Sequence, residues 1–412
     1  MKPSKLPDIN ALSLEQQVAQ MIVVRASGYL FDHQIQYPVW EPPAATLQHW
    51  LQNLGVGGVI LLGGSAPELA LRSQQLQDWA KIPLLIAADI EEGVGQRFLG
   101  ATWFPPPMAL GAIARKDLTL AQQYAFQMGA IIAQEALAIG INWVLAPVVD
   151  VNNNPDNPVI NIRAFGETST EVSQLTTAFI QGAQQYRVLT TAKHFPGHGD
   201  TAVDSHLELP VLPHTPERLA EIELPPFAAA IEAGVDTVMS AHLLIPAWDA
   251  EKPATLSGRI LTGELRQNLG FEGLIVTDAL VMGAIANGYG SNEAPILALE
   301  AGADILLMPV DPEGAIQAIC EAIKTGRISP QRIQASVERI WQAKLKLGYQ
   351  AADSSPSLIQ NPPVPSKIQN LSIQNPKSKI QNSLNLLAEP AALETAANIL
   401  KYSTEIIGST PL

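Results

Sequence analysis

The segment from Lys193 to His206 holds a dense group of reactive side chains. Its fourteen residues include three of the seven histidines, one lysine and two aspartates. Asp204 stands two residues before His206, so its carboxylate can accept the imidazole N–H, fix the tautomer and raise the basicity of the ring. We therefore predict that His206 is a general acid and base, and that Asp204 and His206 lie together on a glycine-rich loop.

A metal site is the alternative for this segment. His194 and His198 are four residues apart, a spacing that suits zinc binding on a helix. Pro196 and Gly197 lie between them, and a proline inside a helix costs about 3 kcal/mol. The sequence therefore predicts no helical zinc site, although a loop-built site that uses the neighbouring aspartates stays open. We expect no metal and no cofactor.

Asp278 follows the apolar run Leu-Ile-Val-Thr. A carboxylate at the end of such a strand can attack an anomeric carbon and form a covalent glycosyl-enzyme intermediate. A turn-forming or helix-capping aspartate is the ordinary alternative. We predict that Asp278 is a nucleophile.

Three segments contain candidate sugar-binding residues. Asp89 follows an apolar run, and Arg97 stands eight residues later, an arrangement that suits recognition of sugar hydroxyls. Lys193 and His194 end another run and can donate hydrogen bonds to hydroxyl groups. Arg163 lies in a loop ahead of a glycine; taken alone, it is more simply an exposed arginine in a salt bridge.

The elements that must position these residues alternate along the chain. Short apolar runs, rich in Val, Ile and Leu, are typical of strands buried on both faces of a parallel sheet, and helix-like segments separate them. About eight repeats predict a (β/α)8 barrel, with an open doubly wound sheet as the alternative. The predicted strands are Met21–Val24, Gly57–Leu62, Leu84–Ile90, Asn142–Val148, Thr190–His194, Thr237–His242, Leu274–Asp278 and Ala303–Met308. The predicted helices include Glu68–Trp79, Leu118–Ile139, Thr168–Tyr186, Pro216–Ala233, Ile260–Leu269 and Glu293–Ala301.

Ionisable residues follow or end six of the predicted strands. Barrel enzymes place their active sites at the carboxyl ends of the strands, and capping alone does not readily explain six such positions. The residues are Asp89, Asp150, Lys193 with His194, His242, Asp278 and Asp311.

The domain organisation is predicted from a change in composition. A catalytic barrel is expected over residues 1–348. A low-complexity linker rich in Ser, Pro, Asn and Gln is expected over 349–384, where the triplet Ile-Gln-Asn occurs four times. A short helical tail is expected over 385–412, with its helix near Pro390–Tyr402. Two interpretations stay open for it: a helix that docks on the barrel, or the start of a truncated second domain.

The overall composition limits the partners. The 412 residues are 47% hydrophobic and 16% charged, which supports a large core. A net charge of −14 argues against nucleic acid or an anionic membrane as a partner. Neither a signal peptide nor an apolar run of about 18 residues occurs. We expect a cytoplasmic monomer that acts on a small carbohydrate.

Taken together, these segments resemble the family 3 glycoside hydrolases, in particular their β-N-acetylglucosaminidase branch. The resemblance covers most of residues 12–348 and rests on motifs in the family's order. They are Asp-x-Glu-x-Gly…Gln-Arg-Phe, Arg-x-Phe-Gly, Lys-His-Phe-Pro-Gly-His-Gly…Asp-Ser-His and an apolar triplet followed by Thr-Asp. One departure is Glu92-Gly93-Val94, where branch members have Gly-Gly-Arg, and it puts the ion pairs around Asp89 in question.

The resemblance implies a retaining exo-β-N-acetylglucosaminidase. It assigns Asp278 as the nucleophile, His206 with Asp204 as the acid/base pair, and the sugar-binding role to Asp89, Arg97, Arg163, Lys193 and His194. The implied substrate is a terminal β-linked N-acetylglucosamine, for example on muropeptides in cell-wall recycling. A phosphorylase or β-glucosidase of the same family, a metal-dependent barrel hydrolase and a non-catalytic sugar-binding protein are the alternatives.

Overall fold

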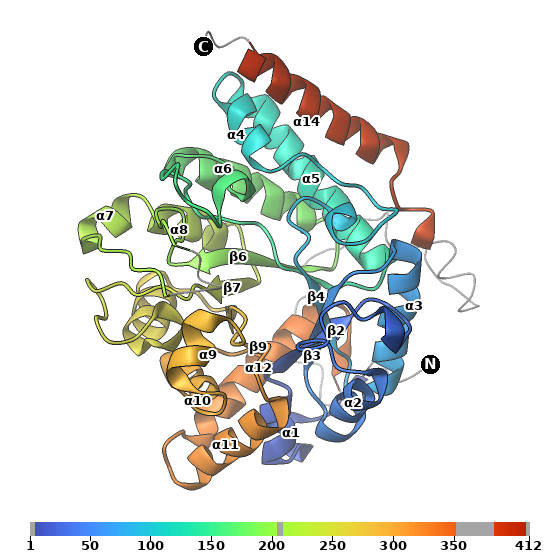
Figure 1. The fold of residues 1–412 in the computed structure, drawn as a ribbon, viewed down its shortest axis with the longest axis vertical. Helices are drawn as coiled ribbons and strands as arrows, with labels where there is room; N and C mark the ends of the chain where they lie inside the picture. The colour runs from blue at the N-terminus through green and yellow to red at the C-terminus, as the bar shows by residue number, and fades with distance from the viewer. Residues whose placement is uncertain (1–4, 204–208, 352–382, 409–412) are drawn as a thin grey trace.

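The computed structural model describes residues 5–203, 209–351 and 383–408. Its centre is a parallel sheet of eight strands in the order β8-β7-β6-β5-β4-β3-β2-β9. Backbone hydrogen bonds from Thr277 N–H to Ile305 O and from Asp304 N–H to Ile275 O join the two ends of this sheet. The predicted (β/α)8 barrel is therefore confirmed (Figure 1). The strands are β2 (Ile22–Ser27), β3 (Gly58–Leu62), β4 (Leu85–Ala88), β5 (Trp143–Val144), β6 (Leu189–Phe195), β7 (Thr237–Ser240), β8 (Leu274–Thr277) and β9 (Leu306–Leu307).

Each of the eight predicted runs overlaps one of these strands; β2 and β6 extend beyond their runs, and the other strands are shorter than predicted. The run from Asn142 to Val148 forms only the two-residue β5, because Pro147 has no N–H to donate to a neighbouring strand. The run that ends at Met308 forms only β9, because Met308 has a φ of 49° and turns the chain out of the extended conformation.

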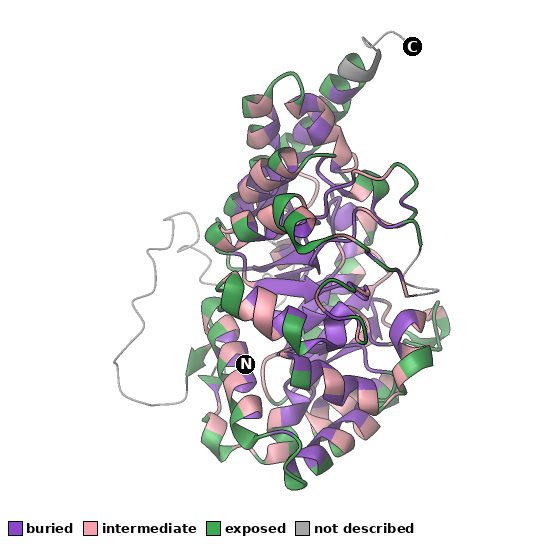
Figure 2. Ribbon diagram, turned by 90° about the vertical axis from the view of Figure 1, so that its left-hand side faces the viewer, coloured by how far each residue is buried: buried purple, intermediate pink, exposed green. Residues whose placement is uncertain are grey.

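Helices surround the barrel and place their apolar faces against it (Figures 1 and 2). Several begin at a Ser, Thr or Asp whose side chain accepts a backbone N–H of the first turn, as Ser65, Thr168 and Ser329 do. The helices are α1 (Leu14–Ala19), α2 (Ala44–His49), α3 (Ala66–Trp79), α4 (Met108–Ala114), α5 (Leu118–Ala138), α6 (Ser169–Ala183), α7 (Pro216–Glu221), α8 (Leu224–Glu232), α9 (Gly283–Tyr289), α10 (Glu293–Ala301), α11 (Pro312–Lys324), α12 (Pro330–Lys346) and α14 (Pro390–Gly408).

Two helix predictions need correction. The predicted helix Pro216–Ala233 is two helices, α7 and α8, because Pro225 and Pro226 open the second one and cannot continue the first. The predicted helix Ile260–Leu269 is the π-helix η7 (Arg259–Asn268), whose turns are wider than those of an α-helix.

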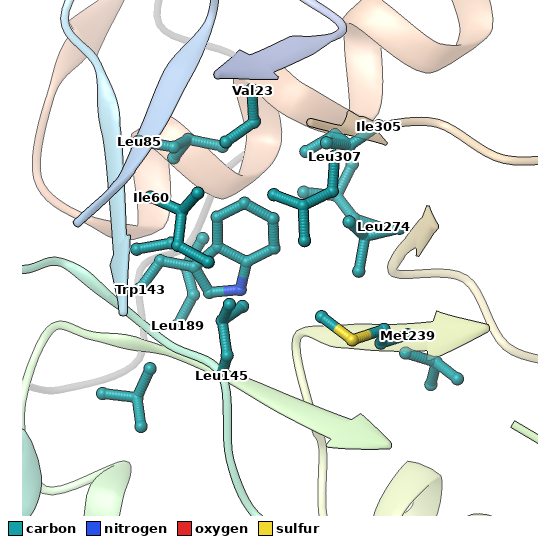
Figure 3. Packing of buried hydrophobic residues seen from close by; sticks show 14 of the residues in the cluster. Val23, Ile60, Leu85, Trp143, Leu145, Leu189, Met239, Leu274, Ile305 and Leu307 are labelled. Carbon is teal, nitrogen blue, oxygen red and sulfur yellow. The ribbon is translucent and has the colours of Figure 1, made fainter. Parts of the chain in front are cut away.

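The barrel interior is filled by apolar side chains around Trp143 (Figure 3). The indole is fully buried, and its Nε1 donates hydrogen bonds to the hydroxyl oxygens of Thr191 at 2.9 Å and Thr237 at 3.1 Å. The ring nitrogen therefore has polar partners inside an otherwise apolar core, as a buried tryptophan requires. The barrel is a packed scaffold rather than a channel.

The C-terminal part of the described chain returns to the barrel. The short strands β1 (Lys5–Leu6) and β10 (Gln350–Ala351) pair with each other. Helix α14 packs along α4 and α5 (Figure 1), where Ile399 is buried and the rings of Tyr124 and Tyr402 lie 6.2 Å apart. Residues 352–382, which make up most of the predicted linker, lie outside the described residues. Within the described ranges, every helix lacks the length or the apolar character that a bilayer crossing demands.

Candidate active site

The candidate site lies at the carboxyl ends of neighbouring strands β4 to β8. Parallel strands place these ends at one mouth of the barrel, so residues far apart in sequence meet there. The side chains involved are Asp89 after β4, Asp150 after β5, Lys193 and His194 in β6, His242 after β7 and Asp278 after β8.

Lys193 is the centre of an ion-pair network. Its Nζ donates to Asp89 Oδ1 at 2.8 Å and lies 2.5 Å from Glu91 Oε1, although the lysine side chain is buried. Burial by itself lowers the pKa of Lys193, but the carboxylates of Asp89 and Glu91 outweigh it and hold the pKa above its usual value. The lysine is therefore a fixed cation in the site.

Glu91 joins this network to Arg163. The Arg163 guanidinium donates from Nε to Glu91 Oε2 and from Nη2 to Glu91 Oε1, both at 2.8 Å. Burial tends to raise the pKa of Glu91, but Arg163 and Lys193 hold it well below its usual value. Arg163 is therefore a bidentate, half-buried partner of a site residue, which differs from the simpler interpretation as an exposed arginine. The ion pairs around Asp89 form although Val94 stands where branch members have arginine.

Asp150 orients His194. The carboxylate is buried; its Oδ2 lies 2.8 Å from His194 Nδ1, and its Oδ1 accepts the backbone N–H of His198 at 2.7 Å. Burial tends to raise the pKa of Asp150, but His194 and His198 hold it below its usual value. With Nδ1–H donated to Asp150, the His194 ring has a fixed orientation and tautomer.

Asp278 lies at the carboxyl end of β8, where its carboxylate is held by the main chain. Its Oδ1 accepts the Ala279 N–H at 2.7 Å. Burial tends to raise the pKa of Asp278, but His242, His194, the Ala279 N–H and Lys193 together hold it below its usual value. Asp278 is therefore ionised at neutral pH, which is the state that attack on carbon requires.

The comparison with protein families agrees with this geometry. The family description "Glycosyl hydrolase family 3 N terminal domain" matches residues 13–343. The chain belongs to glycosyl hydrolase family 3.

Three similar proteins show how far the likeness extends. "Beta-hexosaminidase A" of Pseudoalteromonas piscicida is 35% identical over 337 residues, which are 74% of this chain and 56% of that protein. "Beta-N-acetylglucosaminidase/beta-glucosidase" of Cellulomonas fimi is 32% identical over 375 residues, 89% of this chain and 61% of that protein. The solved structure of a family 3 β-N-acetylglucosaminidase from Paenibacillus sp. str. FPU-7 has a TM-score of 0.78 and 35% identity, covering 95% of this chain and 69% of that one. The chain thus spans about three fifths of the two curated relatives.

The other predicted site residues are Arg97, Asp204 and His206. Arg97 is exposed, and its Nε donates to the backbone oxygen of Asp89 at 2.9 Å, so it supports the main chain beside the Asp89 carboxylate. Asp204 and His206 lie outside the described residues. The described start of their loop is fixed, because Asn157 Nδ2 donates to the backbone oxygens of His198 at 2.8 Å and Gly199 at 3.0 Å.

Three site residues were absent from the predicted set: Glu91, Asp150 and His242. Asp150 follows a predicted strand, His242 ends one, and Glu91 lies inside a quoted motif, so all three carried a signal. His242 is buried, with Nδ1 2.8 Å from Thr255 Oγ1 and Nε2 3.1 Å from Ala279 O. The described residues contain no group of three or more His, Cys, Asp or Glu arranged as metal ligands.

Proposed function

We propose that this family 3 protein is a retaining exo-β-N-acetylglucosaminidase. The observation that carries the proposal is an ionised Asp278 that shares one barrel mouth with the network of Asp89, Lys193, Glu91 and Arg163. The network offers fixed donors and acceptors for sugar hydroxyls, and Asp278 offers a nucleophile. The names of the relatives from Pseudoalteromonas piscicida and Cellulomonas fimi support the choice of an N-acetylhexosamine.

The proposed reaction has two displacement steps. In the first, an Asp278 carboxylate oxygen attacks the anomeric carbon, and the bond to the leaving-group oxygen breaks as that oxygen takes a proton from His206. In the second, water attacks the anomeric carbon, His206 takes a proton from the water, and the bond to Asp278 breaks. Asp204 supports the imidazolium. The roles of Asp204 and His206 come from the sequence.

Asp89, Lys193, His194, Arg163 and Arg97 hold the terminal sugar in this proposal. Their hydrogen bonds would strengthen as the ring flattens toward an oxocarbenium-like transition state. Asp150 keeps the His194 ring turned to one face, so the ring contributes a preorganised polar group.

Asp278→Ala tests the nucleophile. The substrates are aryl β-glycosides of N-acetylglucosamine, glucose and xylose, and the stereochemistry of the product is followed by NMR. We expect the parent to prefer the N-acetylglucosaminide with retention of configuration, and the variant to stay folded without turnover. Full activity in Asp278→Ala, or an inverted product, would refute the proposal.

His206→Ala tests the acid/base role. Loss of general acid catalysis should slow substrates with poor leaving groups much more than activated aryl substrates, because only the former need a proton on the departing oxygen. An equal loss on both would assign His206 to binding instead. Assays in phosphate buffer that follow sugar 1-phosphate separate hydrolysis from phosphorolysis.

We further propose that the natural substrate is a muropeptide from cell-wall recycling, handled by a monomer in the cytoplasm. The support is the resemblance to the β-N-acetylglucosaminidase branch. Release of N-acetylglucosamine from purified muropeptides tests the substrate. Cell fractionation tests the compartment, and the mass in solution tests the monomer.

A further inference from the structure

The loop after β6 is anchored on both sides by the loops of the neighbouring strands. Its first residues pack against the loop after β5, where a Cβ on Gly199 would come within 1.8 Å of the Val151 backbone oxygen. Its last residues run beside the loop after β7: Leu212 N–H donates to Leu244 O at 2.8 Å, and Leu244 N–H donates to Pro210 O at 2.9 Å. Because β5, β6 and β7 are neighbours in the sheet, the loop leaves and rejoins the described structure at two fixed places at the barrel mouth.

An ion pair joins these two places. His214 Nε2 lies 2.8 Å from Asp200 Oδ2, although the two residues are 14 positions apart in the chain. The side chains are 24% exposed for Asp200 and 27% for His214, so water and salt screen this pair less than a pair on the open surface. A contact between distant positions restricts the conformations of the chain between them.

Arg218 and Glu223 hold the Asp200 carboxylate from the side of helices α7 and α8. Helix α8 contacts β6, and α7 lies next to α8 (Figure 1). Arg218 Nη2 lies 3.5 Å from Asp200 Oδ2, and its Nη1 donates to the two carboxylate oxygens of Glu223 at 2.8 and 2.7 Å. Glu223 is buried and packs against the start of the same loop, because a Cβ on Gly197 would lie 2.9 Å from its Cβ. The second partner of Asp200 is therefore itself fixed to the base of the loop.

We propose that Asp200 and His214 are positioning residues that tie together the two ends of the loop that carries His206, a proposal that rests on the proposed function. His206 stands six positions after Asp200 and eight before His214. Six to eight residues of extended chain span about 20 to 29 Å, so an anchor at one end alone leaves an imidazole a wide range of positions. General acid catalysis needs the imidazole within hydrogen-bond reach of the leaving-group oxygen. The pair therefore acts on the reaction through His206.

The dependence on the leaving group tests this positioning role. We would measure kcat/KM for the dinitrophenyl and the phenyl β-N-acetylglucosaminides, which have a good and a poor leaving group, in the parent and in each variant. The variants are His214→Ala, His214→Gln, Asp200→Ala, the double variant Asp200→Ala/His214→Ala, His206→Ala and His49→Ala. His49 is the matched control, since its Nε2 lies 3.6 Å from a Glu313 carboxylate oxygen in an exposed pair that joins α2 and α11. Thermal unfolding shows whether each variant is folded.

We expect His214→Ala and Asp200→Ala to lower kcat/KM about tenfold on the phenyl glycoside and less than about twofold on the dinitrophenyl glycoside, because only the poor leaving group needs a proton as it departs. The double variant should lose no more than either single variant, since each substitution breaks the same pair. His214→Gln should keep most of the activity, because the glutamine amide can donate to Asp200 in place of the imidazole. His206→Ala should show the same selectivity more strongly, and His49→Ala should behave as the parent.

Amide hydrogen exchange over residues 200–214 separates this proposal from the proposed function. Exchange there should be about tenfold faster in His214→Ala than in the parent and unchanged in His49→Ala, whatever reaction the protein catalyses. If His206→Ala slows both glycosides equally, the acid/base assignment fails, and faster exchange in His214→Ala still shows that the pair ties the loop.

Two results would overturn the positioning pair. One is exchange over residues 200–214 that is the same in His214→Ala as in the parent, because the pair would then not hold the loop. The other is an equal effect of His214→Ala on the two glycosides, or none, while His206→Ala remains selective. The pair would then act on the stability of the loop base without acting through His206.

Discussion

Lys344 is a buried cation whose removal should stabilise the protein. It lies on α12 with its side chain fully buried, donates to Gln20 Oε1 at 2.7 Å, and has its Nζ 5.3 Å from the centre of the Trp341 ring. Burial lowers its pKa from 10.5 to about 7. The folded state therefore holds the proton far less tightly than the unfolded chain does.

The size of this effect follows from proton linkage. Each unit of pKa difference corresponds to about 1.4 kcal/mol, so a shift from 10.5 to about 7 costs about 4 to 5 kcal/mol when the lysine is charged. Because the pKa is lowered on folding, the unfolded state binds more protons between these two pKa values. Stability from this group therefore rises as the pH rises from about 7 to about 10.5, and the full penalty applies below about pH 7.

Lys344→Met removes the penalty but leaves Gln20 Oε1 without its donor. A buried acceptor without a partner costs about 1 to 3 kcal/mol. The net expectation is a gain of about 1 to 4 kcal/mol in the free energy of unfolding at about pH 6, shrinking or reversing at about pH 9.5. Urea unfolding at both pH values measures it, with the exposed Lys324→Met as the matched control.

The measurement that decides is how the difference in free energy of unfolding between the parent and Lys344→Met changes with pH. Other groups titrate in the same range, but they are common to both proteins and cancel in the difference. A difference between parent and Lys344→Met that is the same at both pH values would show that Lys344 does not lose its proton in this window, and the reasoning would be wrong.

Three substitutions at the barrel mouth test the site. Glu91→Gln leaves Lys193 and Arg163 with one carboxylate fewer to balance their charge. It should lower kcat/KM, and it should lower the free energy of unfolding by about 3 kcal/mol, seen as a lower midpoint of thermal unfolding. An unchanged melting curve would show that Glu91 does not stabilise the two cations. Asp150→Asn should lower kcat/KM about tenfold to hundredfold by weakening the bond that orients His194, whereas an unchanged kcat/KM would make that bond dispensable. His242→Gln removes the imidazole that does most to lower the pKa of Asp278, so the acid limb of the pH–rate profile should move to higher pH; a limb that stays in place would show that the imidazole does not act on the carboxylate.

The sequence predicted the strands well because their apolar character is continuous and local. Burial on both faces leaves a run of Val, Ile and Leu that needs no knowledge of the partner strand. The ends were less predictable, because they depend on backbone events such as Pro147 in β5 and the positive φ of Met308 after β9. The break between α7 and α8 was visible in Pro225 and Pro226, but the prediction gave more weight to the helical period around them.

The site was predicted only in part because its pairs are long-range. Arg163 reaches Glu91 across 72 positions, and Asp150 reaches His194 across 44. Glu91 stood inside a motif, yet nothing local indicates that it binds two cations. Closure of the barrel creates these contacts. The local sequence therefore indicates which residues end the strands, but not which distant residues form ion pairs and hydrogen bonds with them.

The charges at the mouth form two sets that differ in function. Lys193, Arg163, Asp89 and Glu91 balance two cations against two anions. Under the proposed function, a neutral sugar would therefore meet oriented donors and acceptors and little net charge. Asp278 is different: across the described residues no salt bridge reaches it, and a backbone N–H together with nearby imidazoles and Lys193 holds its pKa down. A carboxylate locked in a salt bridge would lose nucleophilicity. In the proposed reaction, Asp278 keeps its charge available for the anomeric carbon, where positive charge develops in the transition state.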